Sequence, residues 1–527
     1  MPSLPARTDA LRLGTVPERA AARHPGTVIT LDHDLVLYPG AARQMTVAQL
    51  ADRVDDLAAR LWAGGVRPTE HVVVHATAGF DIYLLATAAA RVGAVPVMLS
   101  PHLDGESVAA LLRRLETPHL ITDAGKLTGS LAEVPVAELC ARVLTVAEAP
   151  AGDVGAVSLA DLAGAPRRGP VLLDPDHPAL MTHTSGTTGL PKLVVHSARS
   201  LRGRLRPQVR LARLIRTRET VAVHVSFVHS RMYLAMAVLL PRAMPLVIMD
   251  DGDPEAVAEL FARTRPGLIE THPNSYVEWE GLASDRRRPF ASVKYFSSTF
   301  DALHPGTMDR LLRASERRSP LFFQIYGQSE CGPLVGRGYT RRNAHKADGR
   351  CLGYAMPGIT RFRLVPRDGC PPSRETPGYI EVYTPGRAQT YFGEAERFQQ
   401  QVHGKWWRGG DVGYRTRLGC LHLLDREVDM IRSIHSTLAV EDTVLSRMAE
   451  LVELVLIPGP RQEAVPVVCT RDDAKLDLAR WRAAVAGLEP MAEPVQLPYA
   501  ELPRTATMKI KRLELAARLR ERLGDES

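Results

Sequence analysis

The sequence predicts an α/β protein with a large N-terminal domain, built from parallel-rich sheets with flanking helices, and a small α+β C-terminal domain. Three observations lead to this prediction. Short apolar strands alternate with helices up to about residue 375, short strands and turns follow, and a second α/β alternation begins near residue 426. Such alternation is typical of parallel sheets covered by crossover helices. The 527 residues also exceed the size of one ordinary domain.

Residues 46–67 have the pattern of an amphipathic helix that ends at Gly64-Gly65. Its apolar residues at helical spacing are Val47, Leu50, Val54, Leu57, Ala58 and Leu61. The alternation continues with a strand, a helix and a strand over 71–75, 83–92 and 93–99. Further strands are predicted near 119–122, 221–228, 245–249 and 268–270.

The pattern of predicted secondary structure changes after residue 375. Two short strands, 378–383 and 418–424, lie among turn-rich segments, and we expect them to form a small barrel-like part. The strands predicted over 453–457 and 465–468 belong to the C-terminal domain. The domain boundary is placed between Asp425 and Val428, in a charged segment near residue 426.

Composition and charge favour a globular protein of the cytoplasm. Hydrophobic residues make up 45% of the chain, the formal net charge is +7, and no apolar run has the length of a membrane span. The N-terminus lacks the apolar stretch of a secretory leader. We expect no membrane association and, because no aromatic residues interleave the arginines of 202–218, no nucleic-acid binding. That segment is interpreted as a solvated helix face, with an acidic protein partner as the alternative.

Six cysteines are scattered along the chain without a CxxC pair. They are Cys140, Cys331, Cys351, Cys370, Cys420 and Cys469. This spacing predicts a reducing compartment, and it predicts neither a zinc site nor a disulfide framework.

Residues 182–192 read THTSGTTGLPK and place hydroxyls, glycines and a lysine in one loop. Glycine lets backbone N–H groups approach an anion, and a lysine adds a positive charge. The loop therefore predicts a polyphosphate site, although it lacks the Ser/Thr that follows the lysine of a P-loop. The residues expected to hold the nucleotide phosphates are Thr184, Ser185, Gly186, Thr187, Thr188, Gly189 and Lys192.

This loop resembles the phosphate loop of the acyl-adenylate-forming superfamily, which contains acyl-CoA synthetases, nonribosomal peptide adenylation domains and firefly-type luciferases. These enzymes join a carboxylate to AMP with release of pyrophosphate, and most then pass the acyl group to a thiol. The resemblance implies ATP and Mg²⁺ as cofactors. It implies CoA or the pantetheine of a carrier protein as the thiol.

The segment 324–330 ends in YGQSE and is similar to the family's YGxTE motif. By this resemblance Tyr326, followed by Gly327, stacks on adenine and Ser329 touches the α-phosphate. Glu330 then holds Mg²⁺ together with Thr188. The residue types suit these roles, because a carboxylate is a hard oxygen ligand for magnesium.

Two further motifs follow in the family's order. WWRGGDVG, at 406–413, resembles the family segment whose aspartate binds the ribose, which implies this role for Asp411, and Arg426 matches the family arginine at the same sugar. PRTATMKIKR, at 503–512, resembles PxTxxGKxxR, with Met508 in place of the glycine. The register selects Lys509, rather than Lys511, as the catalytic cation between the attacking carboxylate and the α-phosphate.

The resemblance extends from about residue 46 to 512 and implies that different segments of the chain have different roles. Residues 1–425 are expected to bind ATP and the acyl group, 426–428 to form a hinge, and 429–527 to form a mobile domain that carries Lys509. In the family this domain rotates after adenylation to admit the thiol.

The sequence departs from the family at the rotating part. Val428 occupies the pivot position, which is an aspartate or a lysine in most members, and Ile434-His435 replaces a glycine-containing loop that the pantetheine passes. Bulky residues there resist the backbone geometry of glycine. Two interpretations stay open: the thiol step is impaired, or the loop has drifted with activity preserved.

The acyl pocket is expected to contain His229, Arg231, Ser298 and Thr299. Ser298 and Thr299 replace residues that are often glycine, which narrows the pocket. His229 matches the histidine of acyl- and aryl-activating members. Val228 follows Phe227 where amino-acid-activating members have an aspartate, so an α-amino acid is not expected as substrate. Arg231 meets an extra substrate oxygen or faces solvent.

The leading hypothesis is therefore an ATP-dependent enzyme that adenylates a small non-amino carboxylic acid and transfers the acyl group poorly, leaving transfer to a thioester-forming partner. One alternative is a complete ligase that makes acyl-CoA or an acylated carrier protein. The alternative from another class is a catalytically weak scaffold that binds acyl-AMP.

Overall fold

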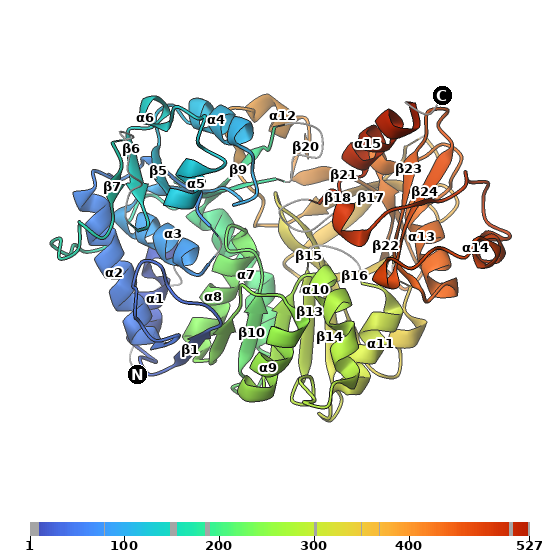
Figure 1. Ribbon diagram of the computed structural model, residues 1–527, viewed down its shortest axis with the longest axis horizontal. Coiled ribbons are helices and arrows are strands. Elements are labelled where there is room, and N and C mark those ends of the chain that lie inside the picture. Colours follow the sequence, from blue (N-terminus) through green and yellow to red (C-terminus); the bar gives the residue numbers. More distant parts are fainter. Residues whose placement is uncertain are drawn as a thin grey trace.

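The computed structural model describes residues 10–77, 79–147, 155–184, 190–299, 303–348, 350–367, 369–504 and 510–524. Two large mixed sheets and their helices form the main body, and a smaller C-terminal part, orange to red in Figure 1, lies at its upper right. The predicted fold class is confirmed. Among the described helices, none combines the length and apolar character needed to span a bilayer.

The larger sheet has a parallel half and an antiparallel half that meet at β14 and β15. The parallel half consists of β1 (Val28–Leu31), β11 (Leu246–Ile248), β10 (Val221–His224), β12 (Leu268–Thr271), β13 (Tyr295–Thr299) and β14 (Leu321–Gln328), with β2 (Gln44–Thr46) antiparallel at its edge. The antiparallel half consists of β15 (Gly332–Tyr339), β16 (Cys351–Ala355), β22 (Leu421–Arg426), β21 (Trp406–Arg415), β18 (Gly378–Tyr383) and β17 (Arg361–Val365), with β20 (Val402–His403) beside β21.

The second sheet has eight strands and is parallel except at one edge. In spatial order they are β19 (Thr390–Tyr391), β9 (Leu193–Ser197), β8 (Pro178–His183), β4 (Val95–Met98), β3 (His71–Val74), β5 (His119–Thr122), β6 (Arg142–Thr145) and β7 (Val157–Ser158). The β8–β9 hairpin makes the antiparallel edge, and its tip holds the two ends of the predicted phosphate loop.

Helices cover the sheets in layers. One apolar core joins both sheets through α2 (Val47–Ala63), α3 (Asp81–Val92), α7 (Ala198–Ala212) and α8 (Ser230–Leu239), which lie between them. On the far face of the larger sheet lie α9 (Pro254–Thr264), α10 (Pro273–Glu278) and α11 (Pro305–Ala314). The outer face of the second sheet is covered by α4 (Gly105–Arg114), α5 (Ala124–Thr128) and α6 (Val136–Leu139). The short helix α1 (Val16–Ala21) packs against α2, and α12 (Ala395–Gln399) packs against β19.

The helix predicted over 46–67 is α2, and the sequence explains both of its ends. The Thr46 side chain accepts a hydrogen bond from the Gln49 N–H while Gln49 reaches back to Thr46, which is a capping box. Gly64 is the C-terminal cap. The apolar residues at helical spacing are all buried. The pattern therefore predicted both the element and the face that packs against the core.

The C-terminal part contains a three-stranded sheet with three helices. Its strands are β23 (Leu451–Pro458), β24 (Ala464–Thr470) and β25 (Val495–Gln496), and its helices are α13 (Thr437–Arg447), α14 (Leu478–Val485) and α15 (Arg512–Gly524). The 3₁₀ turn Glu427–Asp429 covers the end of the predicted hinge. The exact domain limits stay a prediction.

Asp425 connects the main body to the C-terminal part. This buried carboxylate at the end of β22 accepts hydrogen bonds from the backbone N–H and the hydroxyl of Thr437, at the start of α13. Burial raises the pKa of Asp425 to about 6, and the Thr437 hydrogen bonds oppose this shift. The first helix of the C-terminal part is therefore attached to the strand that leads into the predicted hinge.

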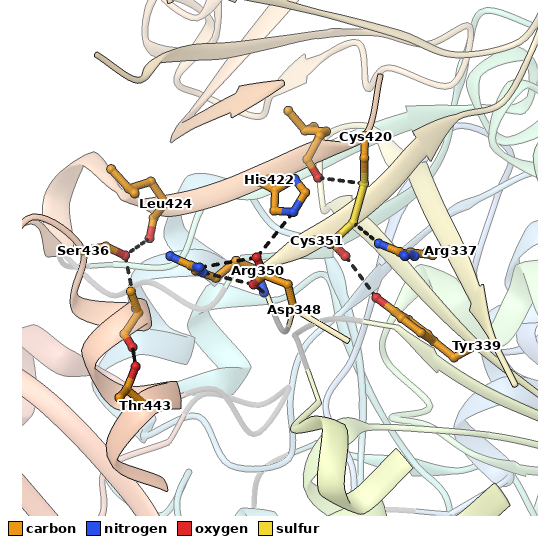
Figure 2. Close-up of polar contacts among 12 residues, drawn as sticks. Arg337, Tyr339, Asp348, Arg350, Cys351, Cys420, His422, Leu424, Ser436 and Thr443 are labelled. Atoms are coloured by element: carbon orange, nitrogen blue, oxygen red, sulfur yellow. Dashed lines mark hydrogen bonds and ion pairs between the residues drawn. A yellow bond between two sulfur atoms is a disulfide. The ribbon is translucent and has the colours of Figure 1, made fainter. Parts of the chain in front are cut away.

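The prediction that the cysteines form no disulfide was wrong for one pair. Cys351 of β16 and Cys420, just before β22, are joined by a disulfide (Figure 2). The strand register explains the pairing, because Cys351 lies opposite His422 and therefore beside Cys420. The two cysteines are 69 positions apart, so sequence spacing could not reveal the contact.

Candidate active site

A cavity of about 460 Å³ lies at the carboxyl ends of β13 and β14, where ligands bind in open α/β sheets. The tip of the β8–β9 hairpin, the start of α8 and the ends of β21 and β22 complete its walls. Of the predicted site residues, it is lined by Thr184, Lys192, His229, Arg231, Thr299, Gly327, Ser329, Glu330, Arg426 and Val428. The structure therefore brings residues from five separate motifs to one cavity.

The phosphate loop is held closed at its two ends. The Thr184 N–H donates to the Lys192 carbonyl at 2.9 Å, and the Lys192 N–H donates to Thr184 Oγ1 at 3.3 Å. The remaining residues predicted to bind phosphate, Ser185, Gly186, Thr187, Thr188 and Gly189, lie outside the described residues. The loop ends face the cavity, as a phosphate loop requires.

Lys192 and Glu330 form a charged group around Tyr391. The ammonium of Lys192 lies 4.8 Å from the centre of the Tyr391 ring, and the Tyr391 hydroxyl donates to Glu330 Oε1 at 2.6 Å. Burial lowers the pKa of Lys192, and the negative charge of Glu330 opposes that shift. A cation and a carboxylate at one cavity wall suit a nucleotide phosphate and its Mg²⁺, for which Glu330 is a suitable oxygen ligand.

Arg204 is a site residue that sequence reasoning missed. It belongs to the arginine-rich segment interpreted as a solvated face, yet it is only 1% exposed. Its guanidinium donates to the carbonyls of Gly386 and Ser329, both at 2.8 Å. Added Cβ atoms at Gly386 and Gly332 would lie 2.6 and 2.9 Å from its side chain, so these glycines make room for it. Arg204 thus fixes the backbone of the residue expected at the α-phosphate.

The remaining arginines of that segment agree with the prediction of a solvated face. Arg206, Arg210, Arg213, Arg216 and Arg218 are exposed, and Arg202 is half-buried. The interpretation was wrong for Arg204 because its position faces the β14–β15 turn, which only the fold brings near α7.

Tyr326 and Asp411 line a second cavity of about 300 Å³ between the main body and the C-terminal part. The Tyr326 hydroxyl donates to Asp411, and Gln328 Nε2 donates to the same carboxylate at 2.6 Å. Arg426 Nε lies 3.6 Å from Asp411 Oδ1 and lines both cavities. The two predicted ribose residues are therefore adjacent, while Tyr326 is held by its hydroxyl rather than standing free.

The part of the first cavity that is lined by Gln208, His229, Arg231 and Thr299, called its far end below, is polar. Arg231, in the first turn of α8, donates through Nε to Glu270 of β12 at 2.7 Å, and its Nη1 contacts the amide oxygen of Gln208 on α7. The side chains of Arg231 and Glu270 are 16% and 5% exposed. Of the two options left open by the sequence, solvent exposure is excluded for Arg231. Glu270 and Gln208 carried no sequence motif.

Three further polar groups lie near this end. His229 caps α8 by accepting the Arg231 N–H at 3.1 Å, and burial lowers its pKa to about 3, so its ring is neutral at pH 7. Ser298 Oγ and Thr299 Oγ1 are buried, and neither has a hydrogen-bond partner within the described part of the chain. Ser298 does not line the cavity, whereas Thr299 does.

The predicted pivot, Val428, lies where the chain enters the C-terminal part. Val428 is 58% exposed at the mouth of the first cavity. Ile434 is buried in the core of the C-terminal part, and His435 next to it is exposed. Lys509 lies outside the described residues. Lys511, the alternative, forms an ion pair with Glu514 at 2.9 Å and lines neither cavity.

One cluster away from the cavities has metal-ligand chemistry. The sulfur atoms of Cys351 and Cys420 and a ring nitrogen of His422 all lie within 4.8 Å of one another. Figure 2 shows His422 directed at Asp348, with Nε2 and Oδ2 3.5 Å apart, and Arg337 donating to Cys351 Sγ. Because the disulfide uses both sulfurs, this cluster offers a single imidazole ligand in this state.

Comparison with known proteins identifies the class. The chain belongs to the AMP-binding enzyme family, whose model matches residues 17–392. It is 47% identical over 529 residues to 3-amino-2-hydroxy-4-methoxybenzoate diazotase of Streptomyces cremeus, covering 97% of this chain and 96% of the relative. It is 24% identical to 3-aminoavenalumate diazotase of a Streptomyces species, covering 78% and 74%.

A solved structure supports the fold. The anthranilate CoA ligase AuaEII, in complex with anthranoyl-AMP, matches with a TM-score of 0.83 at 18% identity, covering 98% of each chain. The protein is therefore an enzyme with the adenylating-enzyme fold, as the sequence motifs predicted. The roles of the individual site residues stay predictions.

Proposed function

We propose that this enzyme is an ATP-dependent, AMP-forming diazotase that acts on an amino-substituted aromatic carboxylic acid. The observation that carries the proposal is the 47% identity, over nearly the full length of both chains, to a relative named for this reaction on a benzoate. The match to a second diazotase supports it. An arylamine has no α-ammonium group, so the missing aspartate after Phe227 agrees with this substrate class.

The family's chemistry extends to diazotisation if nitrite takes the place of the carboxylate. Nitrite is a planar oxyanion, and one of its oxygens attacks the α-phosphorus of ATP and releases pyrophosphate. The amine nitrogen then attacks the nitrogen of the mixed anhydride and loses a proton, and AMP leaves with the bridging oxygen. The N-nitroso amine tautomerises to a diazohydroxide, which takes up a proton and loses water to give the diazonium group. The nitrogen of nitrite is already at the oxidation level that the diazonium group requires, so the reaction needs no further oxidant.

The proposed roles follow the geometry of the first cavity. Lys192 and the loop it closes hold the polyphosphate, and Glu330 supplies a carboxylate ligand for the Mg²⁺ that accompanies ATP. Ser329, whose backbone Arg204 holds, is directed to the α-phosphate. Lys509 stabilises the anion that forms as nitrite meets phosphorus. Mg²⁺ neutralises phosphate charge when it is bound.

An arylamine acceptor also accounts for the departures at the thiol side. A diazotase needs no pantetheine channel, so Val428 and Ile434-His435 are compatible with its reaction. The same residues would be a disadvantage in an enzyme that must rotate and admit CoA. In this proposal the arylamine replaces the thiol as acceptor, which gives a reason for an impaired thioester step.

The second candidate is the carboxylate adenylation predicted from the motifs, with acyl-AMP as product and thioester formation impaired or retained. The structural match to a CoA ligase bound to anthranoyl-AMP favours it. In this case the aromatic carboxylate, not nitrite, attacks ATP.

The test is a product assay with purified protein, ATP and Mg²⁺. We expect ¹⁵N-nitrite and an aminohydroxybenzoate to yield a diazo product one mass unit heavier than that from unlabelled nitrite, with AMP formed only when nitrite is present. A control without amine separates activation from transfer. AMP formation that needs the aromatic acid but not nitrite, without any diazo product, would reject the diazotase and leave the second candidate.

A further inference from the structure

We propose that Arg231 anchors the carboxylate of the aromatic substrate at the far end of the cavity, so that the amine and not the carboxylate faces the activated phosphate. This inference rests on the proposed function. It assigns the substrate carboxylate a recognition role, whereas in a carboxylate-adenylating enzyme that group is consumed at the nucleotide.

The guanidinium of Arg231 is positioned before a substrate arrives. Glu270, on β12, binds Nε at 2.7 Å, and Gln208, on α7, contacts Nη1. Within the described part of the chain these are its side-chain partners, and the Nη2 amino group has none. With Nε and Nη1 held by these two partners, the N–H groups of Nη2 remain to donate to an oxygen of a bound carboxylate.

Energetics argue against a purely structural role for this pair. Burying an ion pair costs desolvation energy that its attraction only partly offsets, and apolar residues of similar size fill such a space as well. Glu270 is 5% exposed, while Arg231 is 16% exposed and lines the cavity. Glu270 therefore acts as a positioning residue, and Arg231 is the member of the pair that a ligand can reach.

Thr299 lines the same cavity and lies on β13, the strand next to the one that carries Glu270. Its buried Oγ1 has no partner among the described residues, and because the cavity does not reach this oxygen, no contact with the substrate is assigned to it. Recognition of the substrate at this place therefore rests on Arg231.

The nucleotide residues Lys192, Ser329 and Glu330 line the same cavity as Arg231. A ring whose carboxylate lies at Arg231 directs its other substituents toward these residues. The order of groups along the cavity is then carboxylate, ring, amine and phosphate. Specificity for a carboxylated arylamine then follows from Arg231, which the contacts with Glu270 and Gln208 hold at the cavity wall.

The experiment compares wild type, Arg231→Gln and the control Arg206→Gln, an exposed arginine of α7. Each is assayed with an aminohydroxybenzoate and with the aminophenol that lacks the carboxylate. We expect Arg231→Gln to lower kcat/KM for the carboxylated amine at least about 30-fold, mainly through KM, because a buried charged contact is lost. The aminophenol should be affected less than about threefold, and the control should match wild type.

Equal loss on both substrates, or no loss on the carboxylated one, would overturn the inference. Because Arg231→Gln leaves Glu270 unpaired, the double variant Arg231→Gln/Glu270→Gln is measured too, and it should show the same substrate selectivity with restored thermal stability. If wild type diazotises no arylamine, the proposed function fails. Calorimetric binding of unreactive salicylate then still tests the subsite: we expect it to be lost in Arg231→Gln, and unchanged affinity would overturn it.

Discussion

The nucleotide end and the far end of the first cavity differ in how closely they follow the family. Lys192, Ser329 and Glu330 occur in motifs of the family's order, and the structure brings them to one wall. At the far end, Thr299 stands at a position that is often glycine in the family, and Arg231 adds a charge to the lining. Under the proposed function, the reaction with ATP is retained and the second substrate has changed.

The structural basis of the two ends differs as well. The nucleotide end is built from strand ends and short loops, where one motif supplies several neighbouring residues. The far end is assembled from single residues on α7, α8, β12 and β13. Substrate specificity can therefore change by single substitutions without disturbing ATP binding.

The largest expected effect is at the nucleotide end. Lys509→Ala should lower AMP formation at least about 100-fold while ATP binding survives, because its charge acts chiefly in the transition state. The measurement is pyrophosphate release together with ATP affinity by calorimetry. Lys511→Ala is the matched control. Near-normal activity of Lys509→Ala, with loss in the control, would transfer the role to Lys511.

Replacing Arg204 tests whether the backbone at the nucleotide end depends on a buried side chain that holds it in place. Arg204→Met leaves the Gly386 and Ser329 carbonyls without their donor, and we expect it to lower the free energy of unfolding by about 2–4 kcal/mol. Activity should fall as Ser329 moves. Urea denaturation and AMP formation check this, with exposed Arg206→Met as control. Equal stability of both variants would show that Arg204 is dispensable.

The thiol side is tested by a half-reaction that bypasses activation. Given synthetic aryl-AMP and CoA, wild type should form little thioester, and Val428→Asp with His435→Gly should form about tenfold more, because strain of about 1–3 kcal/mol in the rotated state is relieved. Liquid chromatography of aryl-CoA measures it. Wild-type transfer as fast as that of the double variant would refute the impairment and favour the ligase alternative.

The smallest expected effect is a pH dependence at the C-terminal part. Burial, with Glu441 nearby, raises the pKa of Asp442 from 3.8 to about 7. Since the folded state binds this proton more tightly than the unfolded chain, the stabilisation is complete below about pH 4 and is lost as pH rises through 7.

We therefore expect Asp442→Asn to raise the thermal midpoint by about 2 °C at pH 8 and to change it less at pH 5.5. Scanning fluorimetry across this pH range measures the difference, with the exposed Asp472→Asn as control. An equal shift at both pH values would contradict the assignment.

Patterns among neighbouring residues were sufficient to predict helices and strands and to recognise the nucleotide-binding motifs. The helical spacing over 46–67 predicted α2 and its buried face, and the strand predicted over 378–383 is β18. These features depend on neighbouring residues. Motif order also predicted that Thr184, Lys192 and Glu330 would meet at one cavity.

Long-range contacts could not be predicted in the same way. Arg204 is buried because Gly386, 182 positions away, leaves space for it. The Arg231–Glu270–Gln208 group joins three elements, and the Cys351–Cys420 bond follows from the register of β16 against β22. Each depends on tertiary packing, which residue spacing does not encode.

The central claim is that ATP activates nitrite rather than the aromatic carboxylate, and the fate of oxygen tests it most directly. With ¹⁸O-nitrite and unlabelled aminohydroxybenzoate, we expect AMP to carry one ¹⁸O. A nitrite oxygen forms the new bond to the α-phosphorus and stays on AMP when the amine attacks the nitrogen. The reciprocal experiment, with ¹⁸O in the carboxylate, should give unlabelled AMP. Transfer of ¹⁸O from the carboxylate to AMP would contradict the account and identify a carboxylate-adenylating enzyme.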